Sequence, residues 1–422
     1  MTKVFPFSYD QHDYPNGLRL ITVPTPFPHT VSLYIVVNAG SRNETEAGKS
    51  GFAHLFEHMM FRGTERYSPE KYDAVLKSAG AAQNAYTDDD LTCYHTTFTR
   101  EDLPEILAME ADRFRNLKYQ EEAFRTEARA VLAEYNKDSA EPFNLLHEKL
   151  REAAFTLHPY KHTTMGFLED VQAMPELYEF SKTFHDRYYR PEYTTIVIAG
   201  DVSVDECRKL VEKHWGNWAK GGFQDQIPQD PPFDGPREVK IPWPSQTLPL
   251  LQVGYRTPGY TDEGIESAAL DILSYLYFSQ TSALYEQLVI REQLCDLFFG
   301  HNADHVDPYL YLITARVKDP AQTGRVREII AAAIEQMKNE KIDEQRLQIV
   351  KQHMRYAFSM RMDHTEGIAG LLARYVSLKR SPETINRLYE QYARVSAEDL
   401  QSIAKRYFKE ANRLSVELSY AA

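Results

Sequence analysis

The residues with the clearest chemistry are two histidines and a glutamate in the segment His54-Leu55-Phe56-Glu57-His58. In a helix, side chains four positions apart lie on one face, so His54 and His58 have the spacing that two ligands of one small cation require. Glu57 lies beside the same face, where a carboxylate can act as general base on a metal-bound water. Histidine pairs at this spacing are common by chance, so the glutamate between them gives the pattern its specificity. The alternative is a helix whose histidines pack against polar groups of the core.

A catalytic zinc ion takes three protein ligands and leaves its fourth position for water, and two histidines with one glutamate form a standard set. A helix predicted over about residues 121–137 carries Glu127 and Glu134, which lie two turns apart on one face. Glu134 is the candidate third ligand. On spacing alone, however, an ordinary solvated helix face explains the two glutamates as well as a metal-binding role does.

The elements that must position these residues can be predicted from local patterns. The HxxEH segment falls on a helix over about residues 50–61, with Ser50 as its expected N-cap and Gly63 ending it. β-branched and aromatic residues predict strands at 18–23 and 31–37. Similar patterns predict a helix at about 101–117 and strands at 91–98 and 194–200.

Glycine and proline are concentrated between Lys220 and Pro249, in a stretch that suits neither a helix nor a central strand. The sequences on its two sides share features in the same order, such as Asn84-Ala85 and Asn302-Ala303, each followed by a predicted strand. We therefore predict an α+β fold of two homologous domains, residues 1–220 and 250–422, joined by a linker over 221–249. Only the first domain carries the HxxEH pattern, so the second is expected to be non-catalytic.

The composition excludes several classes of protein. The net charge of −13 makes nucleic-acid binding a poor hypothesis, because such binding depends on basic side chains. Three widely spaced cysteines can form neither a disulfide framework nor a CxxC site, which favours a reducing compartment. No apolar run is long enough to span a membrane, and the N-terminus lacks a secretory pattern. We expect a cytoplasmic protein, or a periplasmic or organellar one whose targeting segment has been removed.

Together these features resemble the pitrilysin and insulysin family of zinc metallopeptidases, in which HxxEH is the inverzincin motif, and within it the branch related to mitochondrial processing peptidase. The resemblance covers almost the whole chain. It includes Gly51-Phe52-Ala53, Asn84-Ala85-Tyr86-Thr87, His158-Pro159-Tyr160 and Tyr189-Arg190-Pro191.

This resemblance implies roles for individual residues. His54, His58 and Glu134 would bind Zn²⁺, Glu57 would activate the water, and Glu127 would support catalysis from behind the ligands or beside the water. The resemblance also implies that each domain is a mainly antiparallel sheet packed with helices, and that the two domains form one half of a clamshell.

The resemblance also implies how a peptide substrate binds. Asn84, Ala85 and Tyr86 match an edge strand beside the zinc that pairs with an extended peptide backbone. Main-chain pairing of this kind does not depend on the side chains of the substrate, so it tolerates many sequences. The expected function is that of a zinc-dependent endopeptidase subunit that hydrolyses peptides or unfolded polypeptides inside a closed chamber.

The chain departs from the family at two positions of its second half. Active single-chain members have an arginine and, seven residues later, a tyrosine that contact the substrate, whereas Val289 and Asp296 stand at the matching positions here. Neither side chain offers the same hydrogen bonds to a developing oxyanion. The resemblance therefore implies a heterodimer in which a homologous partner supplies the Arg/Tyr pair.

Three alternatives to this heterodimer remain. A shift of two residues in the comparison would place Arg291 at the arginine position and remove the departure. The chain could be a self-sufficient homodimeric peptidase of the same family. It could also be a peptide-binding or assembly subunit with little turnover.

Overall fold

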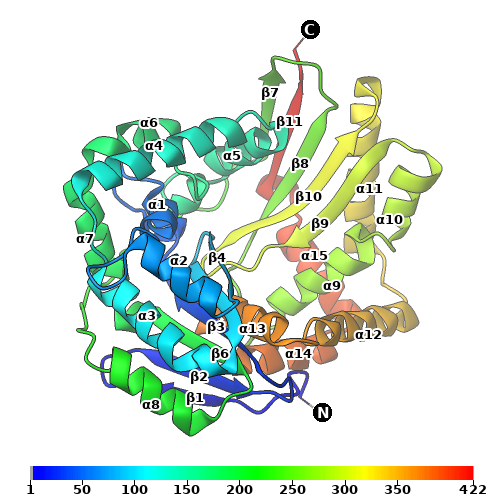
Figure 1. The fold of residues 1–422 in the computed structure, drawn as a ribbon. Coiled ribbons are helices and arrows are strands. Elements are labelled where there is room, and N and C mark those ends of the chain that lie inside the picture. The colour runs from blue at the N-terminus through cyan, green and yellow to red at the C-terminus, as the bar shows by residue number, and fades with distance from the viewer. Residues whose placement is uncertain (1–2, 422) are drawn as a thin grey trace. The chain divides into compact units, whose positions relative to one another are not determined.

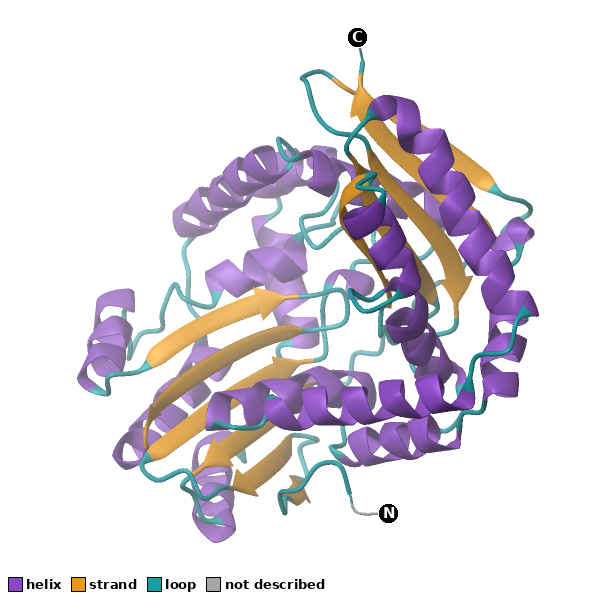
Figure 2. Cartoon of the chain, turned by 90° about the vertical axis from the view of Figure 1, so that its right-hand side faces the viewer, coloured by secondary structure: helices purple, strands orange, loops and turns teal. Residues whose placement is uncertain are grey.

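The structure is a computed structural model that describes residues 3–421, and its contacts divide the chain into two compact units (Figure 1). Each unit combines one β-sheet with several helices (Figure 2), so the predicted α+β fold is confirmed. The first unit comprises Met1–Asn136, His158–Pro228 and Ser359–Pro382, and the second comprises Lys137–Leu157, Gln229–Phe358 and Glu383–Ala422.

The first unit contains the predicted metal helix and six strands. Its strands are β1 (Asp10–Asp13), β2 (Arg19–Pro24), β3 (Thr30–Val37), β4 (Ala82–Thr87), β5 (Thr92–Thr99) and β6 (Thr194–Gly200). Its helices are α1 (Phe52–Met59), α2 (Pro69–Ser78), α3 (Leu103–Asn116), most of α4 (Glu121–Asp138), α6 (Leu168–Ala173), α7 (Tyr178–Tyr188), α8 (Val204–Trp215) and α13 (Thr365–Lys379).

The first sheet has the strand order β1-β2-β6-β3-β5-β4. Only β2 and β6 pair in parallel; the other neighbours are antiparallel. The central strands β3 and β6 are buried along almost their whole length, as their continuous runs of β-branched and apolar residues require. β4 is more polar and partly exposed, which suits its place at the edge of the sheet, where it pairs only with β5.

The second unit repeats this plan. Its sheet has the order β7-β11-β8-β10-β9, which matches β2-β6-β3-β5-β4, and again only the first pair is parallel. Its strands are β7 (Arg237–Trp243), β8 (Leu250–Thr257), β9 (Cys295–Asn302), β10 (Tyr309–Val317) and β11 (Arg413–Tyr420). Its helices are α5 (Pro142–Ala154), α9 (Glu266–Phe278), α10 (Ala283–Tyr285), α11 (Thr323–Asn339), most of α12 (Glu344–Met360), α14 (Glu383–Arg394) and α15 (Ala397–Tyr407). The common strand order confirms that the two domains are homologous.

The two units do not follow a single cut in the sequence. α5, from the first half of the chain, packs against β7, β8 and β11 of the second unit, and α13, from the second half, packs against β3 and β6 of the first. The expected boundaries at residues 220 and 250 do not describe this exchange of helices. β7 also lies inside the expected linker, as an edge strand, where Pro242 is tolerated.

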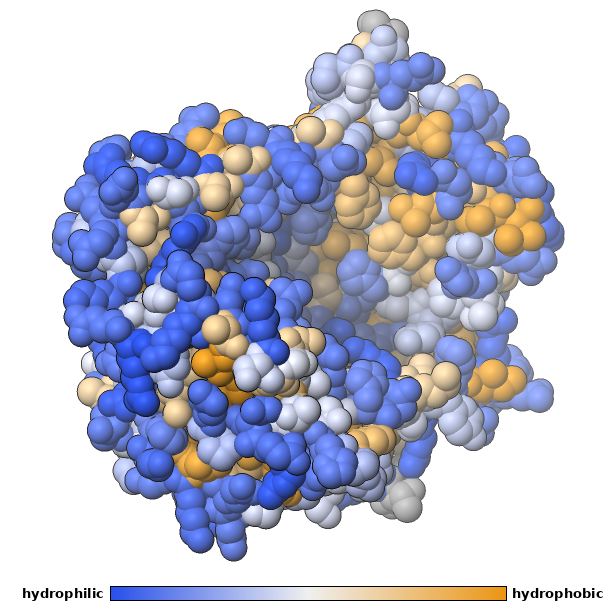
Figure 3. All heavy atoms as spheres, viewed as in Figure 1, coloured by the Kyte–Doolittle hydropathy of each residue, from blue (hydrophilic) through white to orange (hydrophobic). Residues whose placement is uncertain are grey.

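The surface differs between the units. On the face seen in Figure 3, hydrophilic side chains predominate over the first unit, whereas apolar side chains form patches over the second. Among residues 3–421, every exposed large apolar side chain except Met360 belongs to the second unit, for example Ile290 and Tyr356. None of the helices in this part of the chain combines the length and apolar composition needed to cross a membrane.

Candidate metal centre

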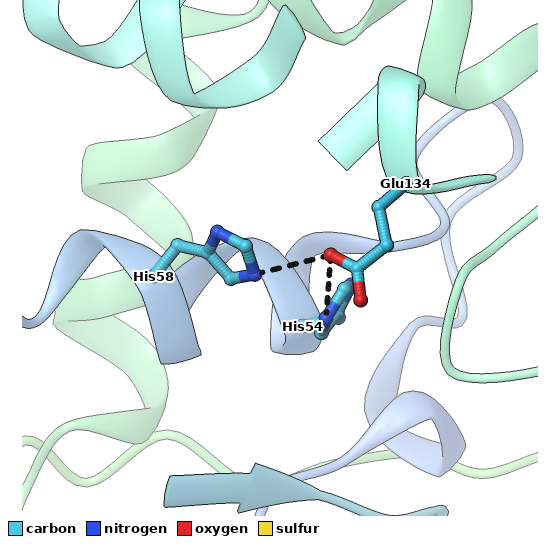
Figure 4. Close-up of side chains that lie close together, drawn as sticks. All are labelled: His54, His58 and Glu134. Carbon is cyan, nitrogen blue, oxygen red and sulfur yellow. Dashed lines mark ion pairs between the residues drawn. The ribbon is translucent and has the colours of Figure 1, made fainter. Parts of the chain in front are cut away.

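Two helices of the first unit bring three candidate ligands together (Figure 4). His54 and His58 project from α1, and Glu134 projects from α4. One potential ligand atom from each side chain lies within 4.8 Å of the other two. Glu134 Oε2 is 3.8 Å from His54 Nε2 and 3.5 Å from His58 Nε2. The structure thus brings together the three residues predicted as metal ligands.

The sequence of α1 explains how the helix that carries the two histidines is oriented. Phe52, Leu55, Phe56 and Met59 are fully buried in the hydrophobic core, which fixes the rotation of the helix about its axis. Gly51, just before the helix, has φ +89°. A Cβ at Gly51 would lie 2.8 Å from a backbone oxygen, so both conformation and space require glycine there.

The three donors fit a zinc ion. Two ligand atoms that are each bonded to one tetrahedral zinc lie about 3.3 Å apart, close to the two distances from Glu134 Oε2. Burial lowers the pKa of His54 to about 4, which keeps its imidazole in the neutral form that binds metals. The side chains of His58 and Glu134 are 28% and 41% exposed, so solvent reaches the cluster from one side.

Glu127 contacts His58, one of the candidate ligands. Its Oε2 lies 3.2 Å from His58 Nδ1, and the guanidinium of Arg62 contacts its other oxygen. Because a carboxylate only accepts hydrogen bonds, this contact favours the His58 tautomer with its proton on Nδ1. In that tautomer Nε2, which lies 3.5 Å from Glu134 Oε2, is the nitrogen that can bind a metal. Of the two positions expected for Glu127, the geometry favours the one behind the ligands.

We expect the Glu127→Gln variant to bind zinc about tenfold more weakly than the wild type, because the amide pairs poorly with both Arg62 and the His58 Nδ1–H. Competition with a chromophoric chelator measures this affinity. Glu122→Gln is a matched control, since Glu122 is an exposed acid of the same helix. Equal affinities for the two variants would show that Glu127 does not hold His58.

Glu57 is held by the last residue of the neighbouring edge strand. Thr87 Oγ1 donates a 2.7 Å hydrogen bond to Glu57 Oε2, and the Thr87 backbone N–H also bonds to this carboxylate. Burial raises the pKa of Glu57, and the two bonds from Thr87 oppose part of that rise. A carboxyl group with a raised pKa is a better general base near neutral pH.

Comparison with known proteins agrees with this geometry. Residues 19–167 match the family model described as insulinase (peptidase family M16), and residues 178–354 match the model described as the peptidase M16 inactive domain. The chain belongs to peptidase family M16. The family resemblance seen in the sequence is thereby confirmed, and the second half matches a domain that is called inactive.

Individual relatives support a metallopeptidase. The zinc protease PqqE of Helicobacter pylori is 27% identical over 413 residues, which cover 96% of this chain and 91% of that protein. A probable mitochondrial-processing peptidase subunit beta of Schizosaccharomyces pombe is 30% identical over 204 residues, 48% of this chain and 44% of that one. The crystal structure of a protease from Helicobacter pylori has a TM-score of 0.91 at 26% identity, with 98% of this chain and 99% of that chain covered.

The residues predicted to pair with substrate lie on β4 of this M16 chain. Asn84 is exposed, Ala85 and Tyr86 are partly exposed, and all three pair with β5 on one side only. β4 packs against α1, and its last residue, Thr87, bonds to Glu57. The strand is therefore fixed next to the candidate base. Thr87 belongs to the segment that resembles the edge strand of the family, but the sequence does not predict its bond to Glu57.

The two positions at which the sequence analysis expects a departure from the family pattern, Val289 and Asp296, lie in the second unit. Val289 is part of a π-helical turn, η6 (Glu286–Arg291), and Asp296 lies on β9. Both carboxylate oxygens of Asp296 accept hydrogen bonds from Arg316, at 2.8 and 2.9 Å. Arg291, which a shift of two residues would place at the arginine position, is exposed, and its Nε lies 3.5 Å from Glu286 Oε1.

The three cysteines are not candidate nucleophiles. Cys93, Cys207 and Cys295 are free and buried. Burial raises the pKa of the Cys93 and Cys207 thiols to about 12, so neither forms a thiolate at neutral pH.

Proposed function

We propose that this chain is the zinc-bearing subunit of an endopeptidase that hydrolyses peptides or unfolded polypeptides. The observation that carries the proposal is the convergence of His54, His58 and Glu134, with Glu57 on the same helix. When bound there, zinc supplies Lewis-acid chemistry: it polarises the scissile carbonyl and acidifies water. These four side chains, together with the ion, are sufficient to explain why the proposed reaction is hydrolysis.

The side chains of α1 and α4 have distinct tasks in this mechanism. His54, His58 and Glu134 hold the ion, and Glu127 keeps the lone pair of His58 Nε2 directed toward it. Glu57 takes a proton from the attacking water on a carboxylate oxygen and delivers it to the nitrogen of the leaving amine. Thr87 keeps that carboxylate in place during both transfers.

The edge strand β4 provides the binding mode for the substrate. Within residues 3–421, no strand pairs with the side of β4 that faces away from β5, so an extended peptide can add there by main-chain hydrogen bonds at Asn84, Ala85 and Tyr86. Such pairing selects for an extended backbone more than for particular side chains. This is why peptides and unfolded polypeptides are the proposed substrates. We propose that cleavage takes place inside a chamber enclosed by two subunits.

A homologous partner subunit completes the active site in this proposal. Val289 cannot donate a hydrogen bond from its side chain, and Asp296 is an acceptor already engaged by Arg316. The exposed apolar side chains of the second unit are of the kind that subunit contacts cover. The partner would supply the arginine and tyrosine that contact the substrate.

The test compares the purified chain with and without a co-expressed homologous subunit, using a quenched fluorescent unfolded protein as substrate. We expect one zinc per chain in both samples, slow cleavage by the chain alone, and a rate at least about 100-fold higher with the partner, because transition-state hydrogen bonds have effects of this size. Cleavage at full rate by the chain alone would overturn the need for a partner. Absence of stoichiometric zinc would overturn the assignment as an enzyme.

A variant of this chain sharpens the same test. The double substitution Val289→Arg and Asp296→Tyr restores both missing side chains and is expected to raise cleavage by the chain alone. Asp296→Asn is its control, since it disturbs the pair with Arg316 without adding a phenol. Full zinc binding with no cleavage under any of these conditions would favour the second candidate, a peptide-binding subunit without turnover.

A further inference from the structure

The start of the metal helix α1 is held by a buried carboxylate from outside the helix. Glu44 Oε2 accepts the backbone N–H of Gly51 and Glu44 Oε1 accepts that of Ala53, both at 2.7 Å. The N–H of Phe52 also bonds to Glu44. These are N–H groups that have no partner within a helix.

Ser50, the expected N-cap, does not cap α1: that prediction was wrong, because the N-cap is Gly51, which has no side chain to do so.

α1 depends on this cap more than a long helix would. It spans only Phe52–Met59, and helices of about two turns are marginal without outside contacts. His54 directly follows Ala53, whose N–H is bound by Glu44. A loosened first turn would therefore displace His54 from His58 and Glu134, and metal sites tolerate displacements of only about 0.5 Å.

The segment of residues 158–170 closes this cap from solvent. His162 Nε2 lies 3.7 Å from Glu44 Oε2, and the Glu44 side chain is completely buried. Ser50 Oγ donates to Asp170 Oδ2 at 2.6 Å and accepts from the Phe167 N–H at 2.8 Å. This segment includes His158-Pro159-Tyr160, a motif for which the proposed mechanism has no use, and Tyr160 ties it to Asp90 by a 2.6 Å hydrogen bond.

We propose that Glu44 is a positioning residue for zinc binding: by holding the first N–H groups of α1 it fixes the place of His54, and residues 158–170 keep water out of that contact. The proposal rests on the proposed function only in taking α1 as the metal helix. Glu44 touches neither the substrate nor the candidate ligands in this role. It acts through the backbone of α1.

The experiment compares Glu44→Gln with Glu46→Gln in the full chain. Burial raises the pKa of Glu44 to about 8, and the backbone N–H donors on its two oxygens oppose that rise because they favour the carboxylate. The amide of glutamine places an NH₂ group against one of these donors, so one of the two shortest bonds is lost at almost unchanged volume. Glu46 is a matched control two residues away, where a partly exposed carboxylate pairs with Lys49 and Arg187. Zinc affinity is measured by chelator competition, and amide hydrogen exchange is measured in the metal-free protein.

We expect Glu44→Gln to weaken zinc binding about tenfold, as loss of an outer-shell partner does, and to accelerate exchange at residues 52–55 while α2 exchanges as in the wild type. Glu46→Gln should change neither quantity. Ser50→Ala, which removes the links to Asp170 and Phe167 but leaves Glu44 in place, should show smaller changes in the same direction. It also provides a milder variant if Glu44→Gln does not fold.

Unchanged zinc affinity in both Glu44→Gln and Ser50→Ala would overturn the proposal, as would faster exchange spread evenly over the whole first unit, which indicates a general stabilising role. Failure of the proposed function looks different. A wild-type chain that binds zinc but cleaves nothing, with or without a partner, contradicts the peptidase and leaves the affinity test intact. If the wild type binds no zinc, the exchange at residues 52–55 still decides whether Glu44 fixes the start of α1.

Discussion

Replacing Glu57 with glutamine will leave zinc bound and reduce peptide hydrolysis by about 1,000-fold in the assembled peptidase. The amide keeps the size of the side chain and its bond from Thr87 Oγ1, but it cannot accept a proton at neutral pH. Loss of a positioned general base has effects of this order. Steady-state cleavage of a quenched peptide, together with the zinc content of the same sample, separates loss of chemistry from loss of metal.

The control for this experiment is Glu65→Gln, because Glu65 is exposed and pairs with Lys118 outside the cluster. It should retain wild-type activity. If Glu57→Gln keeps more than a tenth of the activity, Glu57 is not the base, and proton transfer must be assigned elsewhere. If the Glu57→Gln variant also loses zinc, Glu57 contributes to the metal site. The fall in activity would then measure loss of metal and not loss of the base.

Thr87 is expected to affect catalysis through its hydrogen bond to Glu57. Thr87→Val has nearly the same shape but lacks the hydroxyl that binds Glu57, whereas Thr87→Ser keeps it. Hydrogen bonds to charged groups contribute about 1.5–3 kcal/mol. If the bond from Thr87 stabilises the transition state by this amount, its loss lowers kcat about tenfold or more. Serine should restore most of kcat, and KM and zinc content should change little in either variant.

The sequence predicts well those features that depend on short-range patterns. Local patterns predict helices over residues 50–61, 101–117 and 121–137, and the limits of α1, α3 and α4 lie within two residues of these. The reason is that the apolar period of a helix is set over a few turns. The spacing of His54 and His58 likewise puts both on one face of α1 without any knowledge of the remaining fold.

Contacts made across the fold are less accessible to sequence reasoning. Helical spacing puts Glu127 and Glu134 on one face but does not show that either binds metal, and their separate roles are predicted only by the family resemblance. The packing of α4 beside α1 places Glu134 in the cluster and Glu127 against His58 Nδ1. Thr87 and Glu44 matter through bonds to residues far along the chain or to backbone groups, for which no side-chain pattern exists. The exchange of α5 and α13 between the units is hidden for the same reason, because each helix looks like a continuation of its own half.

Replacing His58 with alanine will abolish stoichiometric zinc binding, and with it hydrolysis. This substitution removes one of three ligands and also leaves Glu127 and Arg62 without the imidazole they orient. Two remaining donors, His54 and Glu134, cannot complete the three-ligand set that catalytic zinc requires. Metal content after dialysis against trace zinc should therefore fall from about one ion per chain to near zero, and activity should not return when the partner subunit is added.

A second histidine provides the control for the first. His353→Ala also removes an imidazole from a helix, α12, but at an exposed position outside the cluster, so zinc content and activity should stay at wild-type levels. Glu134→Ala should behave like His58→Ala, since its carboxylate comes from a different helix but approaches the same point. If Glu134→Ala keeps full zinc while His58→Ala loses it, the ion is held by α1 with some other third donor. The geometry argues against that outcome, because Glu134 Oε2 lies within 4 Å of both imidazoles.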